Sequence, residues 1–183
     1  MRHQGTVRLE TPRLILRRFE MDDAQSMFDN WASDDNVTRF LTWSTHHDVD
    51  ITKKTIQSWI DQYSNPKFYQ WVIVLDEIKE LIGTISVVHP IDDKIQAAEI
   101  GYCIGEKWWN QGITSEALQE VIRFLLDEVQ VNCVLARHDT RNPNSGKVME
   151  KCGMKYDGTL RQYDWNNQGI CDVSFYSILA SEW

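Results

Sequence analysis

The residues of this chain with the clearest capacity for chemistry lie in the segment EIGYCIGEKWWNQGITSEA, residues 99–117. An apolar run leads there through a short turn into a strongly helical stretch, and such a helix start presents unpaired backbone N–H groups and the positive end of its dipole. Gly112 has no side chain and lets an anion approach the backbone closely. A turn glycine without a ligand is the plainer alternative. The pattern is compatible with a cradle for a phosphate or pyrophosphate, formed by Asn110, Gln111, Gly112, Ile113, Thr114 and Ser115, but one glycine before a helix does not decide between the two.

One carboxylate stands out because of its surroundings. Glu99 lies inside the apolar run AAEIGY, which the pattern predicts to be a strand. A carboxylate among apolar neighbours is costly unless it is paired or used in chemistry. Two interpretations stay open for Glu99: a general base, or one half of a structural salt bridge.

Other common sites have no match in the sequence. There is no GxxxxGK[ST] segment and no GxGxxG after a strand, which disfavours a nucleotide hydrolase and a dinucleotide-dependent dehydrogenase. The cysteines occur singly on core-like segments, without CxxC spacing or a neighbouring pair of histidines. We therefore expect buried, reduced thiols and no metal site.

Length and composition limit the class of protein. A chain of 183 residues, 42% hydrophobic, suits a single domain that covers residues 1–183. The formal charge of -8 argues against binding to nucleic acid or to anionic lipid. The sequence shows neither an apolar stretch long enough for a membrane span nor the apolar middle of a signal peptide, so we expect a cytoplasmic protein.

The elements that would position these residues follow from hydrophobic periodicity. Alternation predicts a short strand at 13–19, and helical spacing predicts a helix from Met21 and another over 48–63. Three β-rich runs over 69–104 predict an antiparallel meander, followed by a helix that starts near Thr114. A strand at 133–138 should then lie parallel to an earlier one. Asn142 and Pro143 predict a capped helix start, Gly153 ends that helix, and two strands follow near 155–165 and 170–180.

Taken in order, these segments resemble the GNAT superfamily of acetyl-CoA-dependent N-acetyltransferases, and within it the RimJ/RimL-like group. The resemblance is carried by LETPRLILRRF with DDA, VTRFLTW, AEIGYCI with WWNQGITSEA, NPNSGKVMEKCGM and DVSFYSILASEW. It implies an α/β (α+β) fold with a mixed, mostly antiparallel central sheet of about seven strands, flanked by four helices. It also implies a gap where the strands 95–104 and 133–138 splay apart.

The resemblance further implies where acetyl-CoA would bind. Acetyl-pantetheine would lie in the gap against backbone groups of Tyr102, Cys103 and Ile104, and the pyrophosphate would lie on the cradle at 110–115. Asn142 and Ser145 would contact the cofactor from the following helix. The chain departs from the family pattern [QR]xxGx[GA] at Trp109 and at Thr114, where a β-branched side chain narrows the approach.

The implied reaction is direct attack of a neutral amine on the thioester. The tyrosine that serves as acid in the family is replaced by Met149, so Ser145 or a water is the candidate acid. Glu99 is the first candidate for the base, and Asp164 is its rival because some relatives have a carboxylate there. Covalent catalysis by Cys103 is disfavoured, since nothing in the sequence lowers its pKa.

The acceptor is the least determined part of the prediction. A primary amine is implied, with the N-terminal amine of a protein as the first hypothesis and a polyamine, an amino acid or a drug amine as the second. A GNAT-fold module that holds CoA without turnover is the alternative from another class. Acidic residues near the first helices and the last hairpin, including Asp34, Asp35 and Asp164, suggest an acidic groove for a basic amine. A homodimer is compatible with the resemblance.

Overall fold

The computed structural model describes all residues from 1 to 183. Its strands are β1 (Leu9–Glu10), β2 (Leu14–Arg17), β3 (Gln70–Leu75), β4 (Glu80–Val87), β5 (Ala97–Ile104), β6 (Cys133–Asp139), β7 (Lys155–Asn166) and β8 (Gly169–Leu179). Its α-helices are α1 (Ala24–Met27), α2 (Asp35–Thr38), α3 (Val49–Gln62), α4 (Ile113–Arg123) and α5 (Pro143–Lys151). Wider π-helical turns continue α1 through residues 28–32 and α4 through residues 124–129. None of the helices combines the length and the apolar character needed to cross a membrane.

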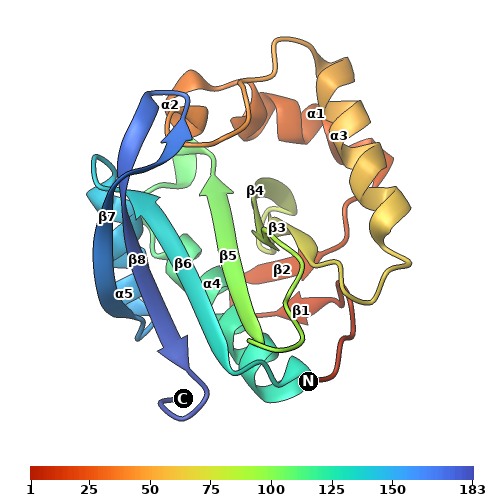
Figure 1. Ribbon diagram of the computed structural model, residues 1–183. Coiled ribbons are helices and arrows are strands. Elements are labelled where there is room, and N and C mark those ends of the chain that lie inside the picture. The colour runs from red at the N-terminus through yellow and green to blue at the C-terminus, as the bar shows by residue number, and fades with distance from the viewer.

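The strands form a single sheet in the order β1-β2-β3-β4-β5-β6-β8-β7 (Figure 1). Every neighbouring pair is antiparallel except β5 and β6, which run parallel on either side of the crossover through α4. The mixed, mostly antiparallel sheet, the meander and the parallel crossover are thereby confirmed. The sheet has one strand more than expected and the molecule has one helix more. Two-residue β1 and four-residue α2 are too short to produce a periodic pattern.

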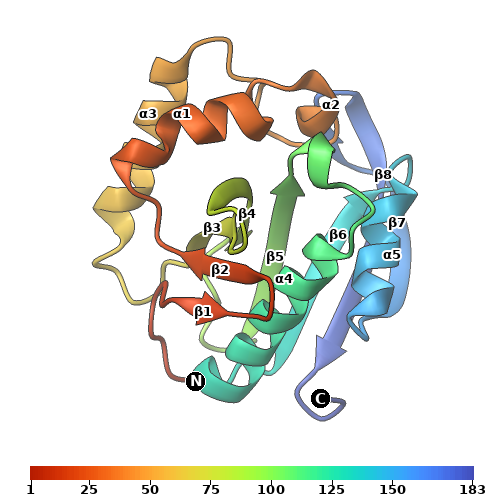
Figure 2. The same ribbon diagram turned by 180° about the vertical axis from the view of Figure 1, so that it is seen from behind.

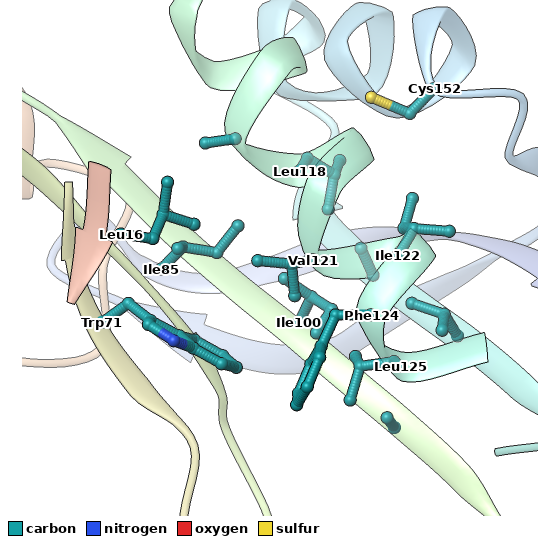
Figure 3. Packing of buried hydrophobic residues seen from close by; sticks show 14 of the residues in the cluster. Leu16, Trp71, Ile85, Ile100, Leu118, Val121, Ile122, Phe124, Leu125 and Cys152 are labelled. Atoms are coloured by element: carbon teal, nitrogen blue, oxygen red, sulfur yellow. The ribbon is translucent and has the colours of Figure 1, made fainter. Parts of the chain in front are cut away.

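Helices cover the two faces of this sheet. Figure 2 shows α4 and α5 lying across one face of the central strands, while α1 and α3 lie away from them over the other. The apolar stripe of α4 is fully buried, as its spacing predicted: Leu118, Val121, Ile122 and Leu125 pack toward Ile85, Ile100 and Trp71 in the larger core cluster (Figure 3). A smaller cluster under α1 and α3 includes Trp31 and Ile56. These two cores hold β5 rigidly from both sides.

The feature of the sheet that matters most for function is the separation of β5 from β6. Their pairing begins at Ala97 with Cys133 and ends at Ile100 with Ala136, although both strands continue. The last four residues of β5 therefore keep their pairing to β4 but have no partner on the other edge. Backbone groups on that edge are available to a ligand. The predicted splay is confirmed.

Candidate active site

A cleft of about 710 Å³ opens where β5 and β6 diverge. Its walls come from the free edge of β5, the end of β6, the loop that enters α4, the first turns of α5, and the segment around α2. All the predicted cofactor residues line it: Tyr102, Cys103, Ile104, Asn110, Gln111, Gly112, Ile113, Thr114, Ser115, Asn142 and Ser145. The sequence prediction thus selected residues that the fold brings into one cavity.

The cleft is cationic, although the chain carries a formal charge of -8. Two carboxylates line it, Glu106 and Asp139, against five basic side chains: Arg39, Arg137, Arg141, Lys147 and Lys151. Arg141 pairs with Asp139, and Arg137 pairs with two carboxylates that do not line the cleft, so the unpaired cations are Arg39, Lys147 and Lys151. The expected acidic groove is therefore wrong for this cavity, since Asp34, Asp35 and Asp164 do not line it. Such an excess of positive charge in a concave site favours a multiply charged anion as ligand.

The cradle has the geometry of an anion site. Gly112 occupies the N-cap position of α4 with φ of 74°, a left-handed conformation that favours glycine. No side chain caps this helix, so its first N–H groups remain open to the cleft. Asn110 also has a positive φ, of 61°, which turns the chain sharply before the helix. Thr114 is half-buried and lies in the first turn of α4, and it leaves the cleft open.

Arg13 braces the cradle from outside the cleft, and sequence reasoning missed it. Its guanidinium donates from Nη1 to the Gln111 carbonyl at 3.1 Å and from Nε to Glu116 Oε2 at 2.6 Å. Thr11 donates to the other oxygen of Glu116 at 2.6 Å. Burial alone would raise the pKa of Glu116, but the hydrogen bonds from Thr11 and Arg13 hold it below its usual value. The turn between β1 and β2 therefore fixes the entry to α4.

The free edge of β5 carries no reactive thiol. Cys103 is buried, and burial raises the pKa of its thiol to about 12, so it stays protonated at neutral pH. Nearby, Trp109 takes the place of the family's polar residue and is 42% exposed. Its Nε1 donates to the Ile104 carbonyl at 2.7 Å, which ties the loop to the end of the strand. Trp108 is buried in the larger core cluster, in agreement with a packing role.

The first turn of α5 presents two polar side chains to the cleft. Asn142 holds the N-cap position, but its side chain makes no capping hydrogen bond, so the predicted side-chain cap is wrong. Pro143 at the first helical position has no N–H to satisfy, which lessens the need for a cap. Ser145 lines the cleft, with its Oγ 2.9 Å from the Tyr102 hydroxyl. Met149 is buried in the core and offers no acid at its position.

The two candidate bases meet at one guanidinium. Arg137 Nε lies 2.8 Å from Glu99 Oε1, and Arg137 Nη1 lies 3.2 Å from Asp164 Oδ2. The side chains of Glu99, Asp164 and Arg137 are 17%, 22% and 27% exposed. Arg137 lines the cleft, while Glu99 and Asp164 do not. Glu99 is thus half of a salt bridge, as one of its two interpretations predicted. The pairing holds its carboxylate near the point where β5 and β6 separate.

The aromatic side chains near the first helices and the last hairpin are mostly outside the cleft. Trp31 is fully buried, and Tyr163 and Trp165 are exposed on β7. Phe40, beside α2, lines the cleft.

The C-terminal hairpin is hydrogen-bonded to the segment 38–43, which contains Phe40. In the turn between β7 and β8, Asn167 Nδ2 donates to the carbonyls of Thr38 and Trp43, each at 2.9 Å. The Asn167 backbone N–H donates to the Leu41 carbonyl at 3.1 Å. The position of the segment 38–43 therefore depends on the C-terminal hairpin.

Asp139, at the end of β6, should make the fold sensitive to acid. Its side chain is 1% exposed and accepts hydrogen bonds from Arg141 and from Asn166. Burial alone would raise the pKa of Asp139, but these hydrogen bonds outweigh burial and lower it from 3.8 to about 2. Because the folded pKa is the lower one, this stabilisation is present above about pH 4 and is lost as the pH falls through 2.

We therefore expect Asp139→Asn to lower the free energy of unfolding at neutral pH by about 2 kcal/mol. Urea titrations at several pH values should show a smaller loss of stability between pH 4 and pH 2 for the variant than for the wild type. If the free energy of unfolding fell equally with pH in the two proteins, Asp139 would not be the cause of the acid sensitivity.

Comparison with known proteins identifies the family to which this fold belongs. A family model described as the acetyltransferase (GNAT) domain matches residues 13–155. The chain belongs to the GNAT acetyltransferase family. This GNAT chain is 33% identical over 171 residues to the uncharacterized N-acetyltransferase YoaA of Bacillus subtilis (strain 168), which covers 93% of the chain and 96% of that protein. It is therefore an N-acetyltransferase.

Two further proteins are similar to this chain. The ribosomal-protein-serine acetyltransferase of Escherichia coli (strain K12) is 30% identical over 126 residues, 69% of each chain. The structure of RimL, a ribosomal L7/L12 alpha-N-protein acetyltransferase in complex with coenzyme A, superimposes with a TM-score of 0.83 at 20% identity. That match covers 94% of this chain and 98% of the other, and at this identity it shows the shared fold.

Proposed function

We propose that this GNAT protein transfers the acetyl group of acetyl-CoA to the N-terminal amine of a protein. The observation that carries the cofactor assignment is the cleft itself: an uncapped helix start, an unpaired strand edge and three unpaired basic side chains meet in one cavity. The pyrophosphate and 3′-phosphate of CoA supply the negative charge that such a cavity favours. The activities named for the E. coli relative and for RimL support a protein N-terminus as acceptor.

Each group of residues has a separate task in this proposal. The N–H groups from Asn110 to Ser115 bind the pyrophosphate, and the free edge of β5 from Tyr102 to Ile104 aligns the pantetheine arm. Asn142, whose amide makes no helix cap, contacts the cofactor from α5. Lys147 and Lys151 face the same cleft and offer charge to its phosphates.

The reaction needs no enzyme nucleophile. The amine nitrogen attacks the thioester carbonyl carbon, a C–N bond forms and the C–S bond breaks. The proton lost by the amine passes through water toward Glu99. The departing thiolate accepts a proton from the Ser145 hydroxyl, and water returns a proton to Ser145 Oγ. Cys103 takes no part, because its thiol is buried and neutral. Asp164 shares Arg137 with Glu99 and supports that ion pair.

Thermal unfolding with acetyl-CoA tests the cofactor assignment. At a ligand concentration near 100 times the dissociation constant, binding should add about 2.7 kcal/mol and raise Tm by roughly 5 to 11 °C. No rise at saturating acetyl-CoA would contradict the site.

The acceptor is tested on the same sample by the release of CoA. We expect turnover with peptides that begin in serine or alanine, and none with the same peptides blocked at the N-terminus. Lysine-containing blocked peptides and polyamines serve as competing acceptors. Faster turnover with polyamines than with free peptide N-termini would replace the protein substrate by a small amine.

A further inference from the structure

The Tyr102 side chain makes a specific contact that the proposed reaction has not yet used. Tyr102 was selected for its backbone on the free edge of β5, but its hydroxyl reaches α5. It lies 2.9 Å from Ser145 Oγ and donates at 3.1 Å to the Ser145 carbonyl. The hydroxyls therefore come from residues 43 positions apart and meet inside the cleft.

The aromatic ring holds this hydroxyl in place. Tyr102 is half-buried, and its ring packs against the larger core cluster beneath α4. Along β5, Ala98, Ile100 and Ile104 point to the same face, because side chains alternate along a strand. Because the ring is packed, the Tyr102 hydroxyl is held at the first turn of α5.

The Tyr102 phenol is suited to donating a hydrogen bond permanently. Burial raises the pKa of Tyr102 well above its ordinary value, and the hydrogen bond with Ser145 opposes this only in part. The phenol therefore stays neutral throughout the neutral pH range and keeps its proton. With one proton and two acceptors on Ser145, it can donate either to the hydroxyl or to the carbonyl.

The two arrangements have different consequences for Ser145. When the phenol donates to the carbonyl, the serine hydroxyl proton is free to point back at the phenol oxygen. When the phenol donates to Ser145 Oγ, that oxygen already accepts a hydrogen bond, and its own proton is directed elsewhere, into the cleft that Ser145 lines. A hydroxyl in the second state is oriented to donate to an anion in the cleft.

We infer that Tyr102 is a positioning residue that orients the Ser145 hydroxyl toward the departing thiolate. This inference rests on the proposed function. The C–S bond breaks, the sulfur takes up the electron pair, and the Ser145 hydroxyl donates its hydrogen bond to the sulfur. As the proton moves to the sulfur, cleft water returns a proton to Ser145 Oγ, so that CoA leaves as the thiol and the serine stays neutral. Tyr102 thus supplies a phenol from β5, whereas the position on α5 where the family has a tyrosine is occupied by the buried Met149.

The test is a double-mutant cycle read as separate kcat and KM values with acetyl-CoA and an accepted peptide. Tyr102→Phe removes the hydroxyl and keeps the ring that packs on the core. We expect kcat to fall about tenfold, the effect of one lost hydrogen bond in the transition state, while KM for acetyl-CoA stays within about twofold. Ser145→Ala should lower kcat at least as much. In the Ser145→Ala background, Tyr102→Phe should have no further effect, because its action passes through Ser145.

Tyr156→Phe is the matched control, since it removes a phenol from an exposed position on β7 outside the cleft. It should leave kcat unchanged, and thermal unfolding should show that all variants fold. Should Tyr102→Phe fail to fold, Tyr102→Leu, which keeps an apolar side chain against the core and carries no hydrogen-bonding group, takes its place in the cycle.

The outcomes separate this inference from the proposed function. Three results would overturn the positioning role while wild-type turnover stands. They are an unchanged kcat for Tyr102→Phe, losses in kcat that multiply when the two substitutions are combined, and an effect confined to the KM for acetyl-CoA. Absence of wild-type turnover with every amine would overturn the proposed function, and the inference with it.

Discussion

Gly112→Glu should abolish binding of acetyl-CoA, with a rise in dissociation constant of about 100-fold or more, equivalent to about 2.7 kcal/mol. Gly112 is the N-cap of α4 at the center of the cradle, and its φ of 74° places it in the left-handed region. The new carboxylate would stand beside the helix N–H groups that an anionic ligand needs. The carboxylate would repel the phosphates of acetyl-CoA and would accept the hydrogen bonds of these N–H groups in their place. Isothermal titration of the variant with acetyl-CoA measures this loss.

The variant should still fold. A Cβ built on Gly112 meets no atom closer than Arg13 Nη2, at 3.7 Å, so the substitution adds no clash. The left-handed backbone costs about 1–2 kcal/mol for a residue with a side chain. Thermal unfolding without ligand should therefore show a lower but cooperative transition.

Two controls separate the charge from the strain. Gly112→Ala adds the strain without the charge and should retain most of the affinity. Gly169→Ala adds similar strain in the hairpin turn, where φ is 87° and no atom lies within 4 Å of the new Cβ. It should lower Tm and leave binding unchanged. If Gly112→Glu bound acetyl-CoA as tightly as the wild type, the phosphates would have to bind at another place than the cradle.

Glu99→Gln should lower kcat by about 100-fold, the usual contribution of a general base. The amide keeps the size of the side chain and its contact with Arg137, but it cannot accept a proton. Glu99 lies on β5, two residues before the unpaired edge begins to line the cleft at Gly101. Steady-state kinetics with a saturating peptide acceptor should show the loss in kcat and little change in the KM for acetyl-CoA.

Asp164→Asn provides the matched control for this prediction. It removes the same charge from the other side of the same guanidinium, and Asp164 lies on β7, at the far edge of the sheet. We expect a loss of less than about threefold in kcat, because a partly exposed ion pair contributes little by itself. Equal losses in the two variants would mean that both carboxylates act only by holding Arg137. A larger loss in Asp164→Asn would make Asp164 the base.

Periodicity predicted the elements that are long enough to repeat. The stripe of α4, the three-stranded meander and the parallel position of β6 all follow from apolar spacing and from the handedness of crossovers. The cradle at Gly112 was suggested by the helix start that the glycine precedes, and the unpaired edge of β5 was predicted because the segment 99–117 carries a family pattern. Two-residue β1 and four-residue α2 contain only about one period of their patterns, too little to show a repeat, and they were missed.

The contacts between distant residues could not be predicted from the sequence. Alternation shows which face of a strand a residue occupies, but the partner depends on register. Glu99 is paired in register with Leu135, and this places Arg137, two residues farther along the same face, within reach of the carboxylate. The contact of Arg13 with Glu116 spans 103 residues, and that of Tyr102 with Ser145 spans 43. No local signal marks any of these pairs.

The order of strands at the β7 edge has a consequence for how the cleft is assembled during synthesis. β8 lies between β6 and β7, so β7 has no partner in the sheet until β8 has been made. Asn167 lies in the turn between these two strands and holds the carbonyls of Thr38, Leu41 and Trp43. The cradle on α4 can form as soon as α4 packs on the preceding strands, whereas the wall beside α2 waits for a contact across 124 or more residues. A nascent chain would thus complete its phosphate-binding half first and acquire the opposite wall only when the final hairpin closes.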